Sequence, residues 1–472
     1  MNRQTTVITP EALRAQEDCC ARIAAYWRSR GRVPRAFVDT YGCQQNEADS
    51  ERIRGILAAC GYAPADEAEG ADCVVINTCA VREHAETRVF GNVGALVHTK
   101  ERHPEQKIFV CGCMMAEPGA AERMKNSYRH VTGVFSPHQL WRFAGLLEQA
   151  LETNRRVFAA ETDAGSIAEG LPVARASDLK AWVSVMYGCN NFCSYCIVPY
   201  VRGRERSRRP EDVLAEISGL AQSGYRDITL LGQNVNSYGR ELEGGGDFSD
   251  LLAAAASFPG EYWLRFMTSH PKDAGKKLFD TMAAHPRIAK QLHLPFQSGS
   301  DRVLAAMNRR YTAESYLKLI EYARSVMPEL VLTSDVIVGF PGETEEDFEA
   351  TLALIRAARC DALFTFLYSP RPGTPAAKLP DPTPREEKSA RFDRLCALQN
   401  EISKERHAAY VGRTLRVLAD GTEDGLVTAR TEGGRLVRVN GPASLVGRFL
   451  NVKITGSTTW SLTGEPAAEK EG

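Results

Sequence analysis

The chain of 472 residues lacks the features that mark membrane-spanning, secreted or strongly basic proteins. No apolar run approaches the roughly 18 residues that a membrane-spanning helix needs. The first ten residues hold one arginine and no apolar core, unlike a secretory signal peptide. The formal net charge is only −1, so any contact with nucleic acid must come from local patches. We therefore expect a cytoplasmic protein with no membrane partner.

The informative features that the chain does have are its length and its number of cysteines. Its 472 residues suffice for two to four domains, and its hydrophobic content of 43% and charged content of 25% are ordinary for a globular protein. Thirteen cysteines without an export signal indicate reduced thiols that bind metal or react, rather than disulfides.

Three of these cysteines, Cys189, Cys193 and Cys196, have the spacing CxxxCxxC. No fourth Cys or His lies nearby in the sequence, whereas a structural zinc site needs four closed ligands. A 4Fe–4S cluster held by three thiolates keeps one iron open for another ligand. The alternative is a loop that is merely rich in cysteine, which this spacing makes less favourable.

A second cysteine set follows from strand and helix alternation in the first 150 residues. A helix is expected over Glu11–Arg30, within a terminal extension of about 33 residues. Three strands then follow, each with a helix after it: Arg35–Thr40, Cys73–Ile76 and Lys107–Val110. This pattern predicts a parallel sheet covered by helices.

Each of the three strands runs into a cysteine: Cys43, Cys79 and Cys113. The carboxyl ends of strands line the ligand crevice in an open α/β sheet, so these thiols are expected to converge as a second three-thiolate set. Strand alternation puts Cys111 on the same side as Cys113, so either residue can be the third ligand on chemical grounds.

A linker is expected over residues 161–180, followed by a central domain. Its six strand candidates are Trp182–Tyr187, Asp227–Leu231, Tyr262–Met267, Gln291–Pro295, Val331–Val338 and Ala362–Tyr368. Most are separated by helical stretches, which predicts an incomplete TIM-like (β/α)6 barrel. The CxxxCxxC loop directly follows the first strand, on the face where such barrels place their active sites.

Other strand ends on that face supply candidate cofactor contacts. Gln233 and Asn234 follow the second strand, and Gly339 follows the fifth, where a glycine lets the backbone approach a ligand closely. Tyr195 lies within the cysteine loop itself. His270 and His293 are possible polar groups of the site. The alternative for each glycine is a tight turn, and for each histidine a structural role.

A basic run comes just after the cysteine loop, with five arginines in eight residues: Arg202, Arg204, Arg206, Arg208 and Arg209. A run of charge is commonly a solvated face. Its position beside the predicted site favours a second interpretation, in which these side chains hold the phosphates of an RNA.

The last part of the chain has a third character. A long polar helix is expected over Thr383–Tyr410. Four short strands follow, separated by glycine-containing turns: Leu415–Leu418, Leu426–Arg430, Leu436–Val439 and Phe449–Ile454. They predict a small OB-like β-barrel, a fold that often binds RNA.

With these motifs in view, the chain resembles the methylthiotransferase family of radical S-adenosylmethionine (SAM) enzymes over all but its first 30 or so residues. The motifs that carry the resemblance are Gly42–Asn46, Asn77–Cys79, Gly112–Cys113 and the CxxxCxxC loop with its aromatic Tyr195. The resemblance implies a domain with an auxiliary cluster over residues 34–150, a radical SAM core over 175–405 and a TRAM barrel over 408–471.

The resemblance also implies two 4Fe–4S clusters and fixes their ligands. The auxiliary cluster takes Cys43, Cys79 and Cys113, which leaves Cys111 as an extra thiol, and the second cluster takes Cys189, Cys193 and Cys196. That second cluster coordinates SAM and cleaves it to a radical, while another SAM donates a methyl group to sulfur at the auxiliary cluster. Tyr195, Gln233, Asn234 and Gly339 become candidate SAM contacts.

The most similar subgroup adds a methylthio group to C2 of N6-dimethylallyladenosine at position 37 of tRNA. The stretches that indicate it are Cys43–Ser50, Leu230–Asn236 and Ser369–Thr374. Sister subgroups modify threonylcarbamoyladenosine in tRNA or an aspartate of a ribosomal protein. A different class, an RNA-binding iron–sulfur redox sensor, stays open. The implied partners are the tRNA anticodon loop, gripped by the basic run and the TRAM barrel, and an electron donor such as flavodoxin or ferredoxin; we expect a monomer.

Overall fold

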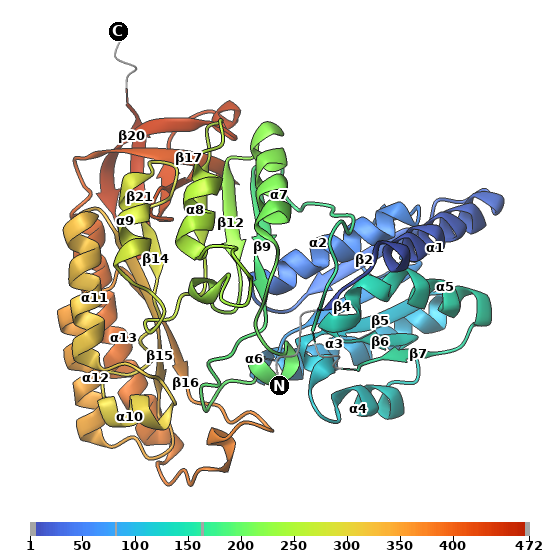
Figure 1. Ribbon diagram of the computed structural model, residues 1–472, viewed down its shortest axis with the longest axis horizontal. Coiled ribbons are helices and arrows are strands. Elements are labelled where there is room, and N and C mark those ends of the chain that lie inside the picture. Colours follow the sequence, from blue (N-terminus) through green and yellow to red (C-terminus); the bar gives the residue numbers. More distant parts are fainter. Residues whose placement is uncertain (1–5, 81–82, 162–164, 468–472) are drawn as a thin grey trace.

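The computed structural model describes residues 6–80, 83–161 and 165–467. Figure 1 shows three parts: an N-terminal α/β domain in blue and cyan, a central half-open barrel in green to orange, and a small β-barrel in red on top of it. Among the described helices, none combines the length and the apolar character needed to cross a membrane. The predicted order of a parallel sheet domain, a partial barrel and a small β-barrel is confirmed.

The N-terminal domain is built on a six-stranded parallel sheet in the order β3-β2-β4-β5-β6-β7. The strands are β2 (Arg35–Thr40), β3 (Ala63–Pro64), β4 (Cys73–Thr78), β5 (Lys107–Gly112), β6 (Gly133–Phe135) and β7 (Val157–Ala159). The helical segments are α1 (Pro10–Ser29), α2 (Gln44–Ala59), α3 (Glu83–Arg102), η1 (Cys113–Ala116), α4 (Ala120–Ser127), η2 (Pro137–Arg142) and α5 (Phe143–Thr153). Side chains of α1, α2 and α5 share one core with the sheet, and those of α3 and α4 share a second core.

Within the expected terminal extension, helix α1 is part of this packing. Helix α1 begins at Pro10 after Thr9, whose hydroxyl accepts a hydrogen bond from the Ala12 N–H. Its buried face, with Ile23 and Trp27, packs in the core shared with α2 and α5. Just before α1, strand β1 (Thr6–Val7) pairs in parallel with β8 (Ser166–Ile167), which lies in the segment expected to be a linker.

The central domain has six parallel strands in two sheets of three, ordered β13-β12-β9 and β14-β15-β16. A bridge between Leu264 and Ile288 joins the two halves, and their side chains share one core. The strands are β9 (Lys180–Ser184), β12 (Asp227–Leu231), β13 (Trp263–Phe266), β14 (Gln291–His293), β15 (Val331–Val338) and β16 (Ala362–Leu367). All six predicted strands are confirmed, and β12 and β15 have the predicted bounds.

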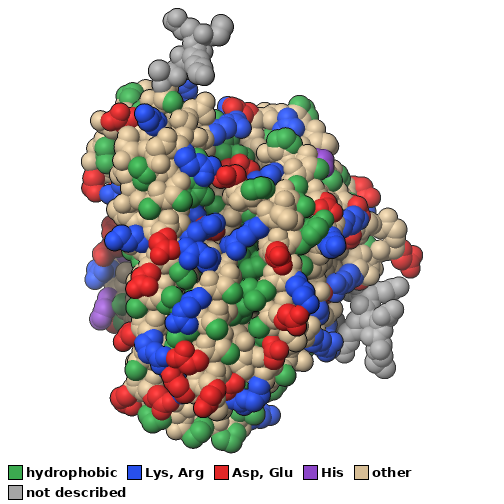
Figure 2. Space-filling view, turned by 90° about the vertical axis from the view of Figure 1, so that its left-hand side faces the viewer, with side chains coloured by type: hydrophobic (Ala, Val, Ile, Leu, Met, Phe, Trp, Pro, Cys, Tyr) green, Lys and Arg blue, Asp and Glu red, His purple; other side chains and the backbone are tan. Residues whose placement is uncertain are grey.

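Helices cover the outside of this half-open barrel (Figure 1). They are α7 (Pro210–Gln222), α8 (Phe248–Ala256), α9 (Lys276–Ala284), α10 (Asp301–Ala306), α11 (Ala313–Val326), α12 (Glu345–Ala358) and α13 (Arg385–Ala408), with short turns η3 (Val235–Ser237) and η4 (Ala376–Lys378). On the face that Figure 2 shows, acidic and basic side chains are interspersed.

The C-terminal part is a closed barrel in the order β17-β18-β19-β21-β20. Its strands are β17 (Thr414–Glu423), β18 (Leu426–Thr431), β19 (Leu436–Val439), β20 (Phe449–Ser457) and β21 (Leu462–Pro466), with η5 (Ala443–Leu445) between β19 and β20. The sequence predicted four strands and missed β21. Leu462 is the only large apolar residue of this strand, so it carries no alternation that a pattern can detect.

The small barrel packs on the amino ends of the central strands. At the start of β9, Lys180 pairs with Asp420, and at the start of β13 the Trp263 ring meets Phe449 edge-on at 4.7 Å. Just before β16, the buried Asp361 pairs with Arg435 of the barrel and with Arg406 of α13. The small barrel therefore lies at the end of the central barrel opposite to the carboxyl ends of its strands.

Candidate functional site

The three cysteines predicted to converge come from neighbouring strands. Strand β4 lies between β2 and β5, with Thr40 beside Asn77 and Thr78 beside Gly112 in the sheet register. The loops that carry Cys43, Cys79 and Cys113 therefore leave the same edge of the sheet side by side. This adjacency is what the strand-end argument predicts.

A buried amide pair fixes two of these loops. The Asn46 side chain donates to Asn77 Oδ1 at 3.1 Å and to the Thr78 carbonyl at 2.8 Å. The Asn77 side chain donates in return to the Asn46 carbonyl at 2.8 Å. The Cys43 thiol lies 3.4 Å from Asn46 Oδ1, so the same asparagine also contacts a predicted ligand. Buried amides with full sets of partners give the thiols a rigid frame.

Cys113 and Cys111 differ in environment. Gly112, at φ +97°, ends β5, and Cys113 starts the η1 turn instead of continuing the strand. Cys111 packs in the core shared with α1, α2 and α5, whereas Cys113 packs with Ala80 and with Ile197 and Val201 of the central domain. The two thiols therefore have different packing neighbours, because the chain turns between them, although the pKa of Cys111, which burial raises, is also affected by Asp49, Cys113 and Arg202.

The Cys113 thiol lies within electrostatic reach of the other two. Burial raises the pKa of Cys113 to about 12, Arg202 opposes this rise, and the Cys79 and Cys43 thiols add to it. In the described part of the chain, no three Cys, His, Asp or Glu side chains come close enough to bind a single metal ion. The donor set consists of thiols alone, which is the donor set of an iron–sulfur cluster.

The CxxxCxxC loop follows the first central strand, and its two ends are held together. Its base is a pair of short antiparallel strands, β10 (Met186–Tyr187) and β11 (Arg206–Ser207). Gly188 precedes the first cysteine at φ +76°, and a Cβ at this position would lie 2.0 Å from the Arg204 carbonyl oxygen. Only glycine fits such a close crossing.

The three thiols of this loop also influence one another. The Cys196 N–H donates to the Cys193 carbonyl at 2.9 Å. Burial raises the pKa of Cys189 to about 12, and the pKa of Cys196 is also raised, first by burial and then by the Cys193 thiol. The buried Arg309 guanidinium lies 3.5 Å from the Cys193 thiol and donates to the Pro295 carbonyl at 2.7 Å. The buried guanidinium thus places a charged donor directly beside a sulfur of this loop.

The two cysteine loops meet across the domain boundary. Helix α6 (Val198–Val201), which follows Cys196, ends at Arg202. The residue Arg202 is only 4% exposed; its Nε donates to the Cys113 sulfur at 3.0 Å and its Nη2 to Asp49 of α2 at 2.7 Å. The loop of one cysteine set thus reaches a thiol of the other.

Two glutamine side chains make a second connection. Gln45, in the motif that begins at Cys43, donates to the Ser184 hydroxyl at the end of β9 at 2.9 Å. Its amide oxygen accepts from Gln233 at 3.5 Å, and the Gln233 oxygen accepts from the Gly188 N–H beside Cys189. Gln233, predicted as a SAM contact, therefore lies between the two cysteine sets.

The other predicted SAM contacts gather at the carboxyl ends of the strands. Tyr195 packs against Met307 and Phe340. Asn234 is buried and donates to Asp273 at 2.7 Å. Within the described chain, no partner is found for several buried polar atoms at these strand ends: Asn234 Oδ1, Asn236 Nδ2, Ser269 Oγ, His270 Nε2 and Tyr368 Oη. Such a concentration of unsatisfied groups is expected where a polar cofactor binds.

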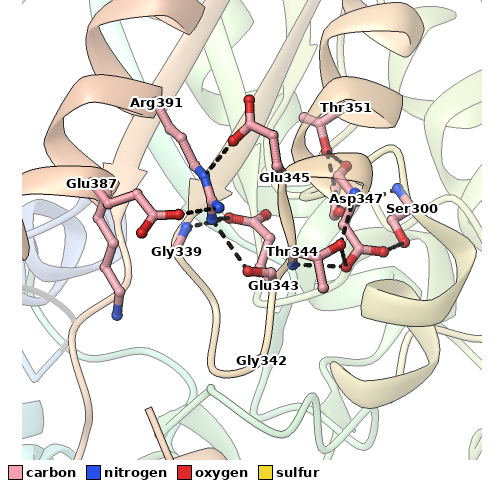
Figure 3. Close-up of polar contacts among 12 residues, drawn as sticks. Ser300, Gly339, Gly342, Glu343, Thr344, Glu345, Asp347, Thr351, Glu387 and Arg391 are labelled. Atoms are coloured by element: carbon pink, nitrogen blue, oxygen red, sulfur yellow. Dashed lines mark hydrogen bonds and ion pairs between the residues drawn. The ribbon is translucent and has the colours of Figure 1, made fainter. Parts of the chain in front are cut away.

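The turn after β15 holds the last candidate, Gly339 (Figure 3). The Gly339 N–H, at φ +75°, donates to the Glu343 carboxylate at 2.6 Å and closes the turn. Glu343 is buried, and burial raises its pKa to about 7 despite the Gly339 N–H and Arg391. Arg391 of α13 also binds the Glu343 carbonyl at 3.2 Å, so a distant helix supports this turn.

The basic run is only partly available to an RNA. Arg202, Arg206 and Arg208 are buried: Arg208 pairs with Glu169 and Glu216, and Arg206 donates to carbonyls of its own loop. Acidic groups distant in the sequence bind Arg202 and Arg208 inside the protein, and carbonyl groups bind Arg206, so these three are not the solvent-facing arginines of the run. Arg204 and Arg209 are exposed.

Sequence reasoning also missed several residues of the site. Asn46 and Asn77 lie within the quoted motifs, but the sequence alone assigned them no role in the site. Polar residues so close to candidate ligands could have indicated that they position those ligands. Ser269 immediately precedes His270 and lies at the same strand end. Asp49 also lies within a quoted motif, but the sequence did not indicate its pairing with Arg202, which is 153 residues away. His293, a possible site group, lies near Thr333 and Asp335.

Comparisons with known proteins agree with this architecture. Residues 183–355 match the Radical SAM superfamily, residues 35–136 the Uncharacterized protein family UPF0004, and residues 408–467 the TRAM domain. Among solved structures, the radical S-adenosylmethionine methyltransferase TsrM from Kitasatospora setae aligns with a TM-score of 0.54 over 73% of this chain and 75% of that chain. Its sequence identity is 14%, so the likeness concerns the fold alone.

Curated relatives are much more similar. The tRNA-2-methylthio-N(6)-dimethylallyladenosine synthase of Alkaliphilus oremlandii is 46% identical over 470 residues, which cover 99% of both chains. The enzyme of the same name from Acetivibrio thermocellus is 47% identical over 430 residues, 90% of both chains. The chain belongs to this family of tRNA-2-methylthio-N(6)-dimethylallyladenosine synthases within the radical SAM superfamily.

Proposed function

We propose that this chain adds a methylthio group to C2 of N6-dimethylallyladenosine at position 37 of tRNA. The observation that carries the proposal is the meeting of two three-thiol loops, linked by Arg202 to Cys113 on one side and by Gln45 to Gln233 on the other. A reaction that needs a radical at one cofactor and sulfur at another requires such neighbouring sites.

Family membership implies SAM and 4Fe–4S clusters as cofactors. When bound, they supply the radical that removes a hydrogen from unactivated carbon, together with the sulfur and the methyl group. We propose Cys43, Cys79 and Cys113 as ligands of the auxiliary cluster and Cys189, Cys193 and Cys196 as ligands of the SAM-binding cluster. Each set offers three thiols, which leaves one iron open to a further ligand.

The other residues of the site position these groups. Tyr195, Gln233, Asn234 and Gly339 lie at the carboxyl ends of the strands, where the unsatisfied polar atoms gather. The amide pair of Asn46 and Asn77 holds the auxiliary loops in place. The apolar contacts among Ala80, Cys113, Ile197 and Val201 exclude water from the boundary between the two thiol sets.

For the tRNA, we propose contacts with the exposed Arg204 and Arg209 and with the TRAM barrel. Because that barrel packs on the amino ends of the central strands, it would hold a part of the tRNA away from the reacting base. The proposed domains span residues 34–150, 175–405 and 408–471. We further propose a monomer in the cytoplasm that receives electrons from flavodoxin or ferredoxin.

Mass spectrometry of tRNA nucleosides from a strain without this gene tests the proposal. We expect the methylthio group to be missing from the dimethylallyl nucleoside and to return with a plasmid copy. Its loss from the threonylcarbamoyl nucleoside, or from a ribosomal protein aspartate, would contradict the proposed substrate. If the purified protein failed to cleave SAM under reducing conditions, it would instead fit an RNA-binding redox sensor.

A further inference from the structure

Arg202 has a place that its membership of a basic run does not suggest. It lies six residues after Cys196, at the end of α6, yet its side chain crosses into the N-terminal domain. There it is 4% exposed and contacts Cys113 and Asp49 at 3.0 and 2.7 Å. By contrast Arg204, two residues away, is exposed and stacks over the Phe192 ring.

The contact of Arg202 with the Cys113 sulfur is not explained by the ion pair between Arg202 and Asp49 alone. Asp49 already receives the Gln45 amide at 3.3 Å and has Arg52 at 3.6 Å, so its charge is compensated from its own helix. The planar guanidinium of Arg202 directs one donor at this carboxylate and a separate donor at the thiol. A neutral thiol is a weak acceptor, so a buried cationic donor gains most from the contact when the sulfur is a thiolate.

We propose that Arg202 is a positioning residue of the auxiliary cluster: it fixes the Cys113 thiolate and ties it to the loop of the radical-generating cluster. This inference rests on the proposed ligand set. Hydrogen bonds and positive charge at a cluster sulfur stabilise the reduced cluster, which carries more negative charge, and so raise its reduction potential. Arg202 also joins the two thiol loops mechanically, since its backbone belongs to one and its side chain to the other.

The test uses the full-length chain reconstituted under anaerobic conditions. In a background with Cys189, Cys193 and Cys196 replaced by Ala, only the auxiliary cluster gives an electron paramagnetic resonance signal. We expect Arg202→Met to shift the midpoint potential of this signal to a more negative value, and Arg202→Lys, which keeps the charge, to shift it less. Arg204→Met, in the same basic run, is the matched control and should leave the potential unchanged.

A second readout comes from the chain with all six cysteines. There we expect Arg202→Met to release 5′-deoxyadenosine while forming several-fold less methylthio product, because the radical site is intact and the sulfur site is displaced. If Arg202→Met fails to fold, the double variant Arg202→Met/Asp49→Asn is used in its place. The double variant removes both buried charges, so neither is left without a partner. Loss of auxiliary iron from that folded double variant would also support the role.

An unchanged potential and an unchanged spectrum in Arg202→Met would overturn the inference and make Arg202 a purely structural ion-pair partner. Failure of the ligand set looks different. In that case the signal would persist after Cys43, Cys79 and Cys113 are also replaced by Ala, whatever residue stands at position 202.

Discussion

Glu343, which closes the turn after β15, offers a quantitative test of the site's electrostatics. Its side chain is 1% exposed, and burial raises its pKa from 4.5 to about 7. The folded protein thus binds this proton more tightly than the unfolded chain does. The stabilisation from this proton is complete below pH 4.5 and is lost as pH rises through 7. At roughly 1.4 kcal/mol per pKa unit, the loss amounts to about 3 kcal/mol.

Glu343→Gln removes this titration and keeps an oxygen that can accept from the Gly339 N–H. Arg391 is not left without partners, because it still pairs with Glu345 at 2.9 Å and with Glu387. We therefore expect the unfolding free energy of the variant, relative to wild type, to increase by about 2 to 3 kcal/mol between pH 5 and pH 8. Thermal unfolding of both proteins across this pH range measures the difference.

Glu345→Gln is the matched control. It removes a carboxylate that binds the same arginine, but Glu345 is half exposed and its pKa is lowered, first by Arg394. The stabilisation from the Glu345 carboxylate is present above pH 4.5 and is lost only below that pH. The unfolding free energy of Glu345→Gln relative to wild type should therefore stay constant from pH 5 to 8. A difference between Glu343→Gln and wild type that is equally flat would refute the reasoning.

Three further predictions concern the cysteine loops, the domain contacts and the tRNA. Gly112→Ala places a Cβ 2.3 Å from the Thr78 carbonyl oxygen, so iron analysis should show loss of the auxiliary cluster and retention of the other; full iron content would contradict this. Asp361→Asn leaves Arg435 and Arg406 without their carboxylate at a cost of about 3 kcal/mol or more, and calorimetry should show an earlier transition for the small barrel. Arg204→Ala should reduce the salt dependence of tRNA binding by about one phosphate contact, whereas Arg208→Ala should lower stability and leave that slope unchanged.

The sequence was sufficient to predict the bounds of those strands that have a clear hydrophobic pattern. Strands β12, β15 and β19 have the predicted bounds, because each is a run of apolar or alternating residues between turn signals. The convergence of Cys43, Cys79 and Cys113 at one sheet edge also follows from strand order alone. Strand β21 could not be predicted from the sequence, because it has only one large apolar residue.

Contacts between distant residues could not be predicted in this way. The acidic partners of Arg202 and Arg208 lie in α2, in the segment before β9 and in α7, so the run looks solvated when it is read alone. The different packing of Cys111 and Cys113 depends on a single backbone turn at Gly112, which strand alternation does not anticipate. The anchoring of α1 on α2 and α5 likewise depends on tertiary burial.

The central claim is that two three-thiol sets hold two clusters, with Cys113 and not Cys111 in the auxiliary set. Iron and sulfide analysis with Mössbauer spectroscopy on anaerobically reconstituted Cys113→Ala and Cys111→Ala tests it most directly. We expect Cys111→Ala to keep both clusters, or about eight irons per chain, and to form product. Cys113→Ala should lose the auxiliary cluster and form none. Two clusters and product in Cys113→Ala would contradict the account.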